Sequence, residues 1–171
     1  RSLADYNCRV IETHLEGMLL RINKIDVWVK LLGDFNAYNL LAVYAVANEC
    51  GIPDSKILKA LSLLKAAQGR FEFVQNESSV LGIVDYAHTD DALKNLLQTI
   101  NKIRTDSKEL IIVFGCGGDR DVSKRLLMAQ VACDLSTQVI ITSDNPRSED
   151  PNNIIRDMMR GLNLIQKQKI L

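Results

Sequence analysis

The chain has 171 residues, which is enough for one ordinary domain or for two small ones. Hydrophobic residues make up 47% of the sequence and charged residues 25%, a balance typical of a globular protein with a packed core and not of a disordered segment. Because 21 basic residues balance 21 acidic ones, the net charge gives no indication of nucleic acid or of an anionic membrane as a partner.

The cysteines and the chain ends indicate a reducing compartment and a longer parent protein. Cys8, Cys50, Cys116 and Cys133 lack C-x-x-C spacing, which argues against a zinc site or a disulfide framework and predicts reduced thiols in a cytosolic protein. No apolar run is long enough to span a membrane, and the N-terminus lacks the features of a signal peptide. The chain opens on RSLADYNCRV and stops on KQKIL, and we expect both ends to be cuts through something larger.

The first 70 residues predict short antiparallel strands followed by two helices. Partial alternation over 7–32, broken by the dipeptides EG and NK, is typical of a meander of three strands. Apolar residues then recur at helical spacing over 36–50, and Gly51 fits the left-handed position just after a helix. A second helix opens at the next Pro-Asp dipeptide, and we expect it to span about 53–65.

After Arg70 the pattern changes to strands that alternate with helices, in the order SVLGIVDYAH, TDDALKNLLQTINKI, ELIIVFGCGG, SKRLLMAQVACDL, TQVIITSD and PNNIIRDMMRGL. The continuous apolar runs LIIVFG and VIIT are typical of parallel strands that are covered on both faces. Alternation at this length implies βαβ units with right-handed crossovers. We therefore predict an α/β fold: a Rossmann-like, mostly parallel sheet with flanking helices over 71–171, preceded over 1–70 by the tail of a different domain.

In such sheets ligands bind beyond the carboxyl ends of the strands, so the loops DYAHTDD, GCGGDRD and SDNPRSEDP are where a site is expected. In the first loop, Asp85 ends a strand and His88 follows it. A carboxylate there can accept hydrogen bonds from ribose hydroxyls, and the imidazole can contact a base or a phosphate. The alternative is a simple helix entry, with Thr89 as N-cap and two acidic residues that complement the helix dipole. That alternative does not account for Asp85 and His88.

The second loop is not a dinucleotide-binding fingerprint. From Gly115 and Gly117 the third glycine of Gly-x-Gly-x-x-Gly would fall at Arg120, so the spacing is not completed. What remains is a flexible turn that holds Arg120 between two acids. We expect Cys116 in this turn to be a small packing residue, because the sequence offers it no partner base.

The third loop combines a helix start with a rigid polar segment. Asp150 or Ser148 serves as N-cap and Pro151 fits the first turn, which leaves DNPR unexplained. Pro146 fixes its own backbone and restricts that of Asn145, and the placement of an amide donor beside a guanidinium suits recognition of a carboxylate.

Two stretches before the α/β region also carry candidate residues. Asn36 and Asn39 lie three apart at a helix start and share one face, and on residue type alone Asn36 is expected to be the N-cap. Arg70, within GRFE at the predicted domain junction, either reaches a phosphate between two domains or pairs with Glu72 or another surface acid.

Five motifs in order resemble those of the Mur ligases of peptidoglycan synthesis: GDFNAYNLL, GRFE, VDYAHTDDAL, FGCGGDRD with a following KR, and SDNPRSEDP. The resemblance spans about 33–161, and five motifs in the same order make it specific. It implies an enzyme with an N-terminal domain for the UDP group, a central ATPase domain and a C-terminal Rossmann-like domain. This chain would then hold the end of the central domain, 1–70, and most of the C-terminal domain, 71–171, truncated at its C-terminus.

The resemblance also implies an activity, in which ATP and Mg²⁺ convert the terminal carboxyl of UDP-MurNAc-L-Ala-D-Glu to an acyl phosphate that the amine of a diamino acid attacks. By position, Asn36 and Asn39 match the family's pair near the adenine. Arg70 and Asp85 match its groups for the phosphates and the ribose, and His88 is expected near the nucleotide. No catalytic or metal-binding residue is expected within this chain.

The same carry-over assigns Arg120, Asp144, Asn145 and Arg147 to the incoming amino acid. Members that add meso-diaminopimelate carry Asp-Asn-Pro-Arg here, and lysine-adding members lack the arginine, so Arg147 implies diaminopimelate. Diaminopimelate differs from lysine by a second carboxylate, and charge-assisted hydrogen bonds to it are worth roughly 1.5–3 kcal/mol each. With lysine the arginine faces no anion, and such a site rejects the analogue by about 10⁴-fold or more.

The chain departs from the family pattern in two ways. Asp90 and Leu126 stand where the family often has proline, both at helix starts where other residues serve. The chain also lacks a Gly-x-x-x-x-Gly-Lys-Ser/Thr P-loop, the family's lysine and acids that hold magnesium, and its GKGHE-like loop. We therefore expect this chain alone to be inactive toward ATP and to bind diaminopimelate weakly or not at all.

Two alternatives stay open. One is another amide ligase of the superfamily, such as the enzyme that adds D-Ala-D-Ala or a folylpolyglutamate synthetase, against which DNPR and GCGGDRD weigh. The other is a non-catalytic nucleotide or amino-acid binding module. For the full-length enzyme the resemblance implies UDP-MurNAc-dipeptide, meso-diaminopimelate and ATP as partners, no nucleic acid or membrane partner, a monomer, and a cytoplasmic location.

Overall fold

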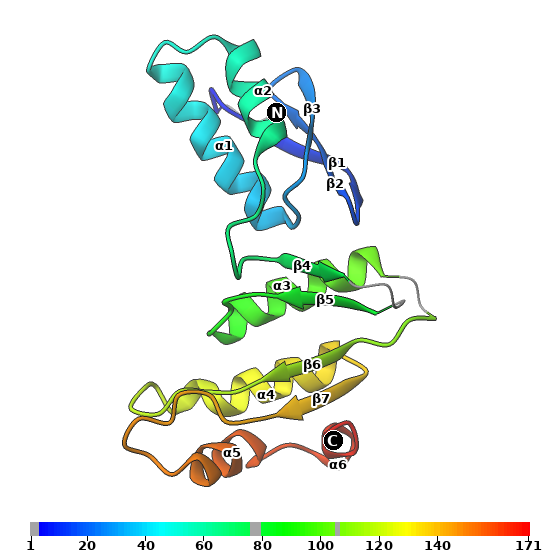
Figure 1. Cartoon of the computed structure of the whole chain (residues 1–171), viewed down its shortest axis with the longest axis vertical. Helices are drawn as coiled ribbons and strands as arrows, with labels where there is room; N and C mark the ends of the chain where they lie inside the picture. The colour runs from blue at the N-terminus through cyan, green and yellow to red at the C-terminus, as the bar shows by residue number, and fades with distance from the viewer. Residues whose placement is uncertain (1–3, 76–79, 105–106) are drawn as a thin grey trace. The chain divides into compact units, whose positions relative to one another are not determined.

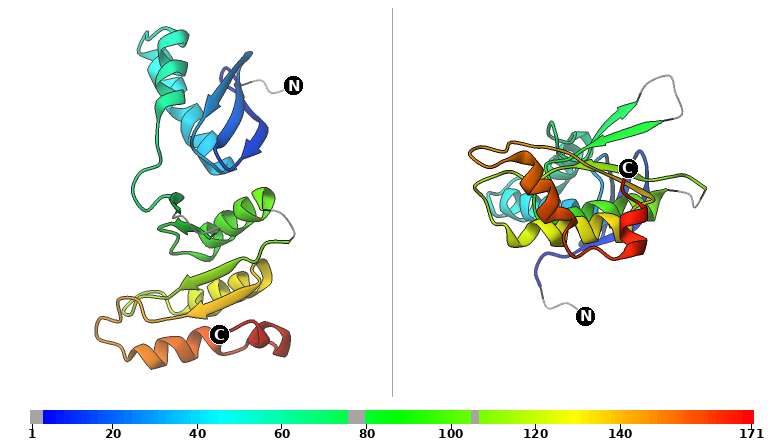
Figure 2. Two further views of the ribbon diagram at one scale, coloured as in Figure 1. Left: turned by 45° about the vertical axis from the view of Figure 1, so that its right-hand side comes forward. Right: turned by 90° about the horizontal axis from the view of Figure 1, so that it is seen from below.

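The computed structural model describes residues 4–75, 80–104 and 107–171. Contacts between residues divide the chain into two compact units, Arg1–Tyr86 and Ala87–Leu171. Their elements are labelled in Figure 1 and seen from two further directions in Figure 2. The predicted boundary near residue 70, between the end of one domain and the start of the next, stays a prediction. The division by contacts identifies compact units and does not test where one domain ends and another begins.

The predicted three-stranded meander is present in the first unit. Strands β1 (Cys8–His14), β2 (Gly17–Ile22) and β3 (Ile25–Val29) pair antiparallel in that order. Alternate residues of β2, namely Met18, Leu20 and Ile22, are buried, as expected for a strand with one face on a core.

Helices α1 (Asp34–Glu49) and α2 (Asp54–Leu63) pack against this sheet, with α1 beside β1 and α2 beside β3 (Figure 1). Gly51 takes the predicted left-handed position after α1, with φ 79°. Its amide bonds the Asn48 carbonyl and the Ile52 amide bonds the Ala47 carbonyl, the two bonds of a Schellman motif. Helix α2 ends two residues before the predicted Lys65.

The predicted cap at Asn36 is wrong. The N-cap of α1 is Gly33, whose φ of 94° is accessible to glycine and strained for other residues. Asn36 lies inside the first turn, where its side chain donates a hydrogen bond to the Leu32 carbonyl at 2.7 Å. The amide thus ties the helix start to the preceding chain instead of capping it.

A short antiparallel pair follows α2 in the first unit. Strand β4 (Glu72–Gln75) was not predicted, and it pairs with β5 (Leu81–Val84), which lies within the predicted strand SVLGIVDYAH. The Ser79 that opens that stretch lies outside the described residues.

The second unit contains the predicted βαβ arrangement. Strands β6 (Ile111–Phe114) and β7 (Gln138–Ile141) pair in parallel and are joined through helix α4 (Ser123–Leu135). Helices α3 (Asp90–Ile103) and α5 (Pro151–Met159) both pack on α4 (Figure 2). Their shared core consists of Leu93, Leu97, Ile112, Cys116, Met128, Ala129, Ala132, Cys133, Val139, Ile154, Met158 and Leu162.

Two of the predicted helix caps of this unit are confirmed. Thr89 accepts the Ala92 amide at the start of α3, and Asp150 accepts the Asn152 amide at the start of α5, with Pro151 in the first turn. Helix α5 ends at Met159, three residues before the predicted end.

A short helix and a bridge to β7 end the chain. Helix α6 (Leu164–Gln168), which was not predicted, begins with a capping box formed by Asn163 and Gln166. After it, Ile170 forms a parallel bridge with Val139: the Val139 amide donates to the Lys169 carbonyl at 2.8 Å, and the Leu171 amide donates to the Val139 carbonyl at 2.9 Å. Within the described residues, none of the helices is both long and apolar enough to cross a membrane.

Candidate functional site

Two loops of the second unit begin side by side, because Phe114 and Ile141 pair as the last residues of β6 and β7. The β6–α4 loop covers 115–122 and the β7–α5 loop covers 142–150. Glycines in the first loop permit close approach of the second. A Cβ atom on Gly115 would lie 2.5 Å from the Thr142 carbonyl oxygen, and one on Gly118 would overlap the Pro146 carbonyl oxygen. These glycines therefore serve loop packing and not dinucleotide binding.

Hydrogen bonds join the two loops into what we call the loop clasp, made by Gly118 and Asp119 with residues 145–149. The Gly118 amide donates to the Asn145 carbonyl at 2.9 Å, and Arg147 Nη1 donates to the Gly118 carbonyl at 2.7 Å. Asp119 accepts from the Ser148 amide at 3.2 Å and from its hydroxyl at 2.7 Å. Ser148, one of the two candidate caps of α5, is thus part of the clasp and leaves the cap to Asp150.

Electrostatics strengthens the clasp. The hydrogen bonds from Ser148 hold the pKa of Asp119 below its ordinary value, with a smaller contribution from the charge of Arg147. The Asp119 amide donates at 2.6 Å to a carboxylate oxygen of Glu149. The two loops therefore contact each other through charged groups as well as backbone.

The backbone of the clasp is strained at two points. Asp119 has a φ of 51° and Arg147 a φ of 50°, which places both in the left-handed region that residues other than glycine seldom adopt. Such conformations cost about 1–3 kcal/mol each and concentrate at functional sites, because the surrounding contacts must hold them. Strain therefore supports the choice of this pair of loops as the site.

The four residues predicted to bind an amino acid all lie on these loops and are exposed. Arg120 and Arg147 come together at Gly117: a Cβ atom there would lie 3.9 Å from Arg120 Cγ and 2.8 Å from Arg147 Nη1. In the described part of the chain, the side chains of Arg120 and Asn145 make no hydrogen bond to another residue. The arrangement presents two guanidinium groups and an amide at the carboxyl ends of parallel strands, which suits a ligand that carries carboxylates.

Arg70 and Asp85 come together in the first unit. Asp85 accepts the Phe71 amide at 2.8 Å, and the Arg70 guanidinium lies over the Tyr86 ring, 4.7 Å from its centroid. Glu72 accepts the Gly69 amide at 2.7 Å, so the contact that it makes in this turn is with the backbone. A strand-end carboxylate and a guanidinium stacked on an aromatic ring thus lie at the same end of the β4–β5 pair, where Glu72 pairs with Val84.

The other nucleotide candidates have local contacts. Asn39 donates to the side-chain oxygen of Asn36 at 3.3 Å, so the two amides do lie on one face of α1. The carbonyl of His88, in the second unit, accepts a hydrogen bond from Lys124 Nζ at 2.9 Å. That contact links the loop before α3 to the start of α4.

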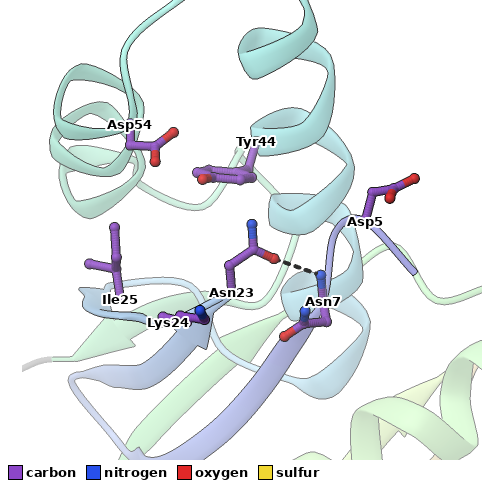
Figure 3. Close-up of a pocket in the computed structure, with 7 residues that line it drawn as sticks. All are labelled: Asp5, Asn7, Asn23, Lys24, Ile25, Tyr44 and Asp54. Atoms are coloured by element: carbon purple, nitrogen blue, oxygen red, sulfur yellow. Dashed lines mark hydrogen bonds between the residues drawn. The ribbon is translucent and has the colours of Figure 1, made fainter. Parts of the chain in front are cut away.

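A pocket of about 520 Å³ in the first unit contains none of the predicted site residues (Figure 3). It is lined by Asp5, Asn7, Asn23, Lys24, Ile25, Tyr44 and Asp54. Burial, and secondarily a hydrogen bond with Asp54, raises the pKa of Tyr44. The Asn23 side chain accepts the Asn7 amide at 3.0 Å and so supports the turn between β2 and β3. These contacts give the lining a structural role.

The comparison with protein families decides the class. A family model described as "Mur ligase, glutamate ligase domain" matches residues 69–169. This chain belongs to the Mur ligase family. The match includes GRFE, both loops of the clasp and the turn that contains Asp85.

Individual Mur ligases and related proteins agree with this assignment. The UDP-N-acetylmuramoyl-L-alanyl-D-glutamate--2,6-diaminopimelate ligase of Cytophaga hutchinsonii is 46% identical over 99% of this chain, and the chain spans 35% of that relative's length. A solved structure of a ligase of the same name overlays with a TM-score of 0.61 at 38% identity, over 95% of this chain and 34% of the other. A folylpolyglutamate synthase from Thermotoga maritima overlays with a TM-score of 0.75 at 19% identity, over 98% and 39%, which shows the fold alone.

One group in this Mur ligase chain was missed by the sequence analysis. Arg125, on α4, is 1% exposed and bonds both Glu149 oxygens, at 2.7 and 2.8 Å, as well as Asp157 at 2.8 Å. The hydrogen bonds from Arg125 and, next, from the Asp119 amide hold the pKa of Glu149 below its ordinary value. Only the KR that follows GCGGDRD marks this arginine in the sequence, and nothing local identifies its partners 24 and 32 residues away.

The described residues contain neither a disulfide nor a cluster of metal-ligating side chains. No group of three or more His, Cys, Asp or Glu residues among them is arranged to hold a metal ion. The four cysteines form no disulfide. Burial raises the pKa of Cys116, which is 4% exposed in the core, and this agrees with the packing role expected for it.

Proposed function

We propose that this chain is the C-terminal part of an ATP-dependent ligase. The ligase adds meso-2,6-diaminopimelate to UDP-N-acetylmuramoyl-L-alanyl-D-glutamate through an acyl phosphate, in the cytoplasm, as a step of peptidoglycan synthesis. Membership of the Mur ligase family and the 46% identity to a ligase named for this reaction support the proposal. The observation that carries it is the loop clasp, which holds Arg147 beside Arg120 where two parallel strands end.

We assign the far carboxylate of diaminopimelate to the clasp. Arg147 is held by its strained backbone and by the bond to the Gly118 carbonyl, so little side-chain freedom remains to be lost when substrate binds. The remaining guanidinium donors of Arg147, with Arg120 and Asn145, are available for charge-assisted hydrogen bonds. Asp144, exposed at the start of the same loop, supplies a carboxylate for an ammonium group.

We assign the nucleotide to the other predicted residues. Arg70 would contact phosphate and Asp85 ribose; Asp85 accepts the amide of Phe71, the residue after Arg70, which brings the two candidates to the same end of the β4–β5 pair. Asn36 and Asn39 would lie near the adenine and His88 near the nucleotide. Mg²⁺ is assigned to residues outside this chain, because the sequence lacks the lysine and acids that hold magnesium in the family.

A second ligase of the superfamily is the competing function. The overlay with a folylpolyglutamate synthase indicates that the fold is common to both, so the fold does not choose between them. The choice depends on the side chains of the clasp, and a guanidinium at position 147 favours an acceptor with an additional carboxylate.

The test is substitution of Arg147 in the full-length protein. We expect Arg147→Ala to raise the KM for diaminopimelate by about a hundredfold, since a lost charge-assisted contact of 1.5–3 kcal/mol corresponds to roughly 10–150-fold. Arg147→Lys keeps the charge but loses the fork of donors, and we expect an intermediate effect. Steady-state kinetics checks both, with the KM for ATP as the internal control. An unchanged KM for diaminopimelate in Arg147→Ala contradicts the assignment.

A further inference from the structure

We infer that Glu149 is a positioning residue for the β7–α5 loop. The buried guanidinium of Arg125 holds Glu149 in place, and Glu149 in turn holds together the loop clasp that orients Arg147. The inference rests on the proposed function and adds to it a residue that does not itself contact diaminopimelate.

The first step is the burial of Arg125. Its side chain is 2% exposed, and a buried charge has to be paired. Two carboxylates pair with this charge: Glu149, from the β7–α5 loop, through Nη2, and Asp157, from the body of α5, through Nη1. Among the described residues, the buried Nε of Arg125 has no hydrogen-bond partner. The Arg125 guanidinium thus has one partner in the β7–α5 loop and one in helix α5.

The second step is the position of Glu149 between the two loops. The oxygen that Arg125 contacts at 2.7 Å also accepts the Asp119 amide at 2.6 Å. The Asp119 carboxylate then accepts both hydrogen-bond donors of Ser148, the residue after Arg147. A chain of hydrogen bonds therefore runs from Arg125 on α4 through Glu149 and Asp119 to Ser148, which follows the strained Arg147 in the sequence.

The third step is chemical. A site that recognises a carboxylate gains from a guanidinium that is held in place before binding, because ordering is then not subtracted from the binding free energy. Removal of the Glu149 charge loosens the clasp and leaves the nucleotide residues and the reacting groups untouched. The effect should therefore fall on the KM for diaminopimelate and not on kcat.

Asp157 provides a matched control. Glu149→Gln and Asp157→Asn each remove one carboxylate charge from the same guanidinium with little change of shape, and of the two only Glu149 belongs to the clasp and accepts the Asp119 amide. In the full-length enzyme we expect Glu149→Gln to raise the KM for diaminopimelate about tenfold or more, with kcat and the KM for ATP within about twofold. We expect Asp157→Asn to lower the melting temperature comparably and to leave the KM for diaminopimelate within about twofold.

The outcomes separate the two proposals. Equal KM values for diaminopimelate in the two variants, or parallel changes in kcat and every KM, would mean a structural role only and overturn the inference. If Glu149→Gln does not fold, Asp119→Ala replaces it, because Asp119 is exposed and does not contact Arg125; an unchanged KM for diaminopimelate in that variant overturns the inference too. A wild-type enzyme that does not use diaminopimelate overturns the proposed function first and this inference with it.

Discussion

Asp119 and Arg147 keep left-handed backbones that few residues other than glycine adopt. Neither conformation is favourable alone, and each is held by contacts that the other's loop provides. The Asp119 carboxylate accepts hydrogen bonds from the amide and the hydroxyl of Ser148, and the Arg147 guanidinium donates one to the Gly118 carbonyl. The strain is thus offset by interactions that exist only when both loops are in place.

The clasp should depend on pH. Both Asp119 and Glu149 have pKa values below their ordinary ones in the folded protein. Their contribution to stability is therefore fully present above the unfolded values, about 3.9 for Asp and 4.3 for Glu, and is lost as the pH falls through the lower folded values. We expect the Asp119 and Ser148 amides to lose protection below about pH 4.

Amide hydrogen exchange followed by NMR over that pH range measures this loss. The Val139 amide, which bonds a backbone carbonyl, is the internal reference. Loss of protection at Asp119 and Ser148 before Val139 is the expected result, and simultaneous loss at all three would contradict a local opening.

Local features at the residue scale were predictable from the sequence. Thr89 and Asp150 were predicted as caps because capping depends on the residue itself and on an amide two or three positions away. Asparagine also favours the N-cap position, but the N-cap of α1 is Gly33, three residues before Asn36, and its φ of 94° suits glycine. The pairing of Arg125 with Glu149 joins residues far apart in the sequence, so no spacing rule identifies it.

At the scale of elements, α4 organises the second unit. Ala129, Ala132 and Cys133 are fully buried on it, and such small residues allow neighbouring helices to approach closely. Helix α3 packs on α4 partly through Leu97, which is 1% exposed. Because α4 also carries Arg125, this packing contributes to the position of the loop clasp.

A leucine pair measures that packing. Leu97→Ala should lower the free energy of unfolding of the second unit by about 2–5 kcal/mol, through lost burial and the cavity left behind. Leu127→Ala, at a position 45% exposed on α4, should change it by less than about 0.5 kcal/mol. Native-state hydrogen exchange of the α3 and α4 amides gives both values. Equal effects of the two substitutions would contradict the packing described.

Helices and strands were predicted correctly where the pattern of apolar residues extended over enough residues to show a period. The five longer helices and the meander were found from their spacing, with ends that differ by a few residues. Strand β4 has four residues, as β5, β6 and β7 do, but its sequence EFVQ has no apolar run like those that indicated the other three. Helix α6, with five residues, is too short to show a helical period. Strand β5 was expected in a parallel sheet and pairs antiparallel with β4. A short apolar run indicates a strand but not its partner.

At the scale of the whole molecule, the chain spans about a third of the length of a relative such as the Cytophaga ligase. Its sequence contains the clasp and the Arg70 turn but no P-loop motif. Backbone amides of a P-loop and its lysine are what hold the phosphates of ATP in such enzymes. Under the proposed function, the chain would therefore supply recognition of the amino acid and some contacts to the nucleotide, and residues outside it would supply the P-loop.

Phosphate release tests this division of roles. We expect the purified 171-residue chain to hydrolyse no ATP above the buffer rate, and the full-length protein to release phosphate only when both acceptor substrates are present. A chain prepared with Arg70→Ala checks for a contaminating ATPase, since a contaminant would be unaffected. Turnover by the 171-residue chain that falls on this substitution would contradict the prediction.

The bridge between Val139 and Ile170 has a consequence for solubility. An exposed strand offers a row of unsatisfied amides and carbonyls to any other chain, which makes uncovered strands sites of aggregation. Lys169 and Leu171 occupy the Val139 amide and carbonyl, so this part of β7 has its hydrogen bonds satisfied within its own chain. The three residues after α6, Lys169 to Leu171, thus protect β7, the strand that leads into the β7–α5 loop, from pairing with a strand of another chain.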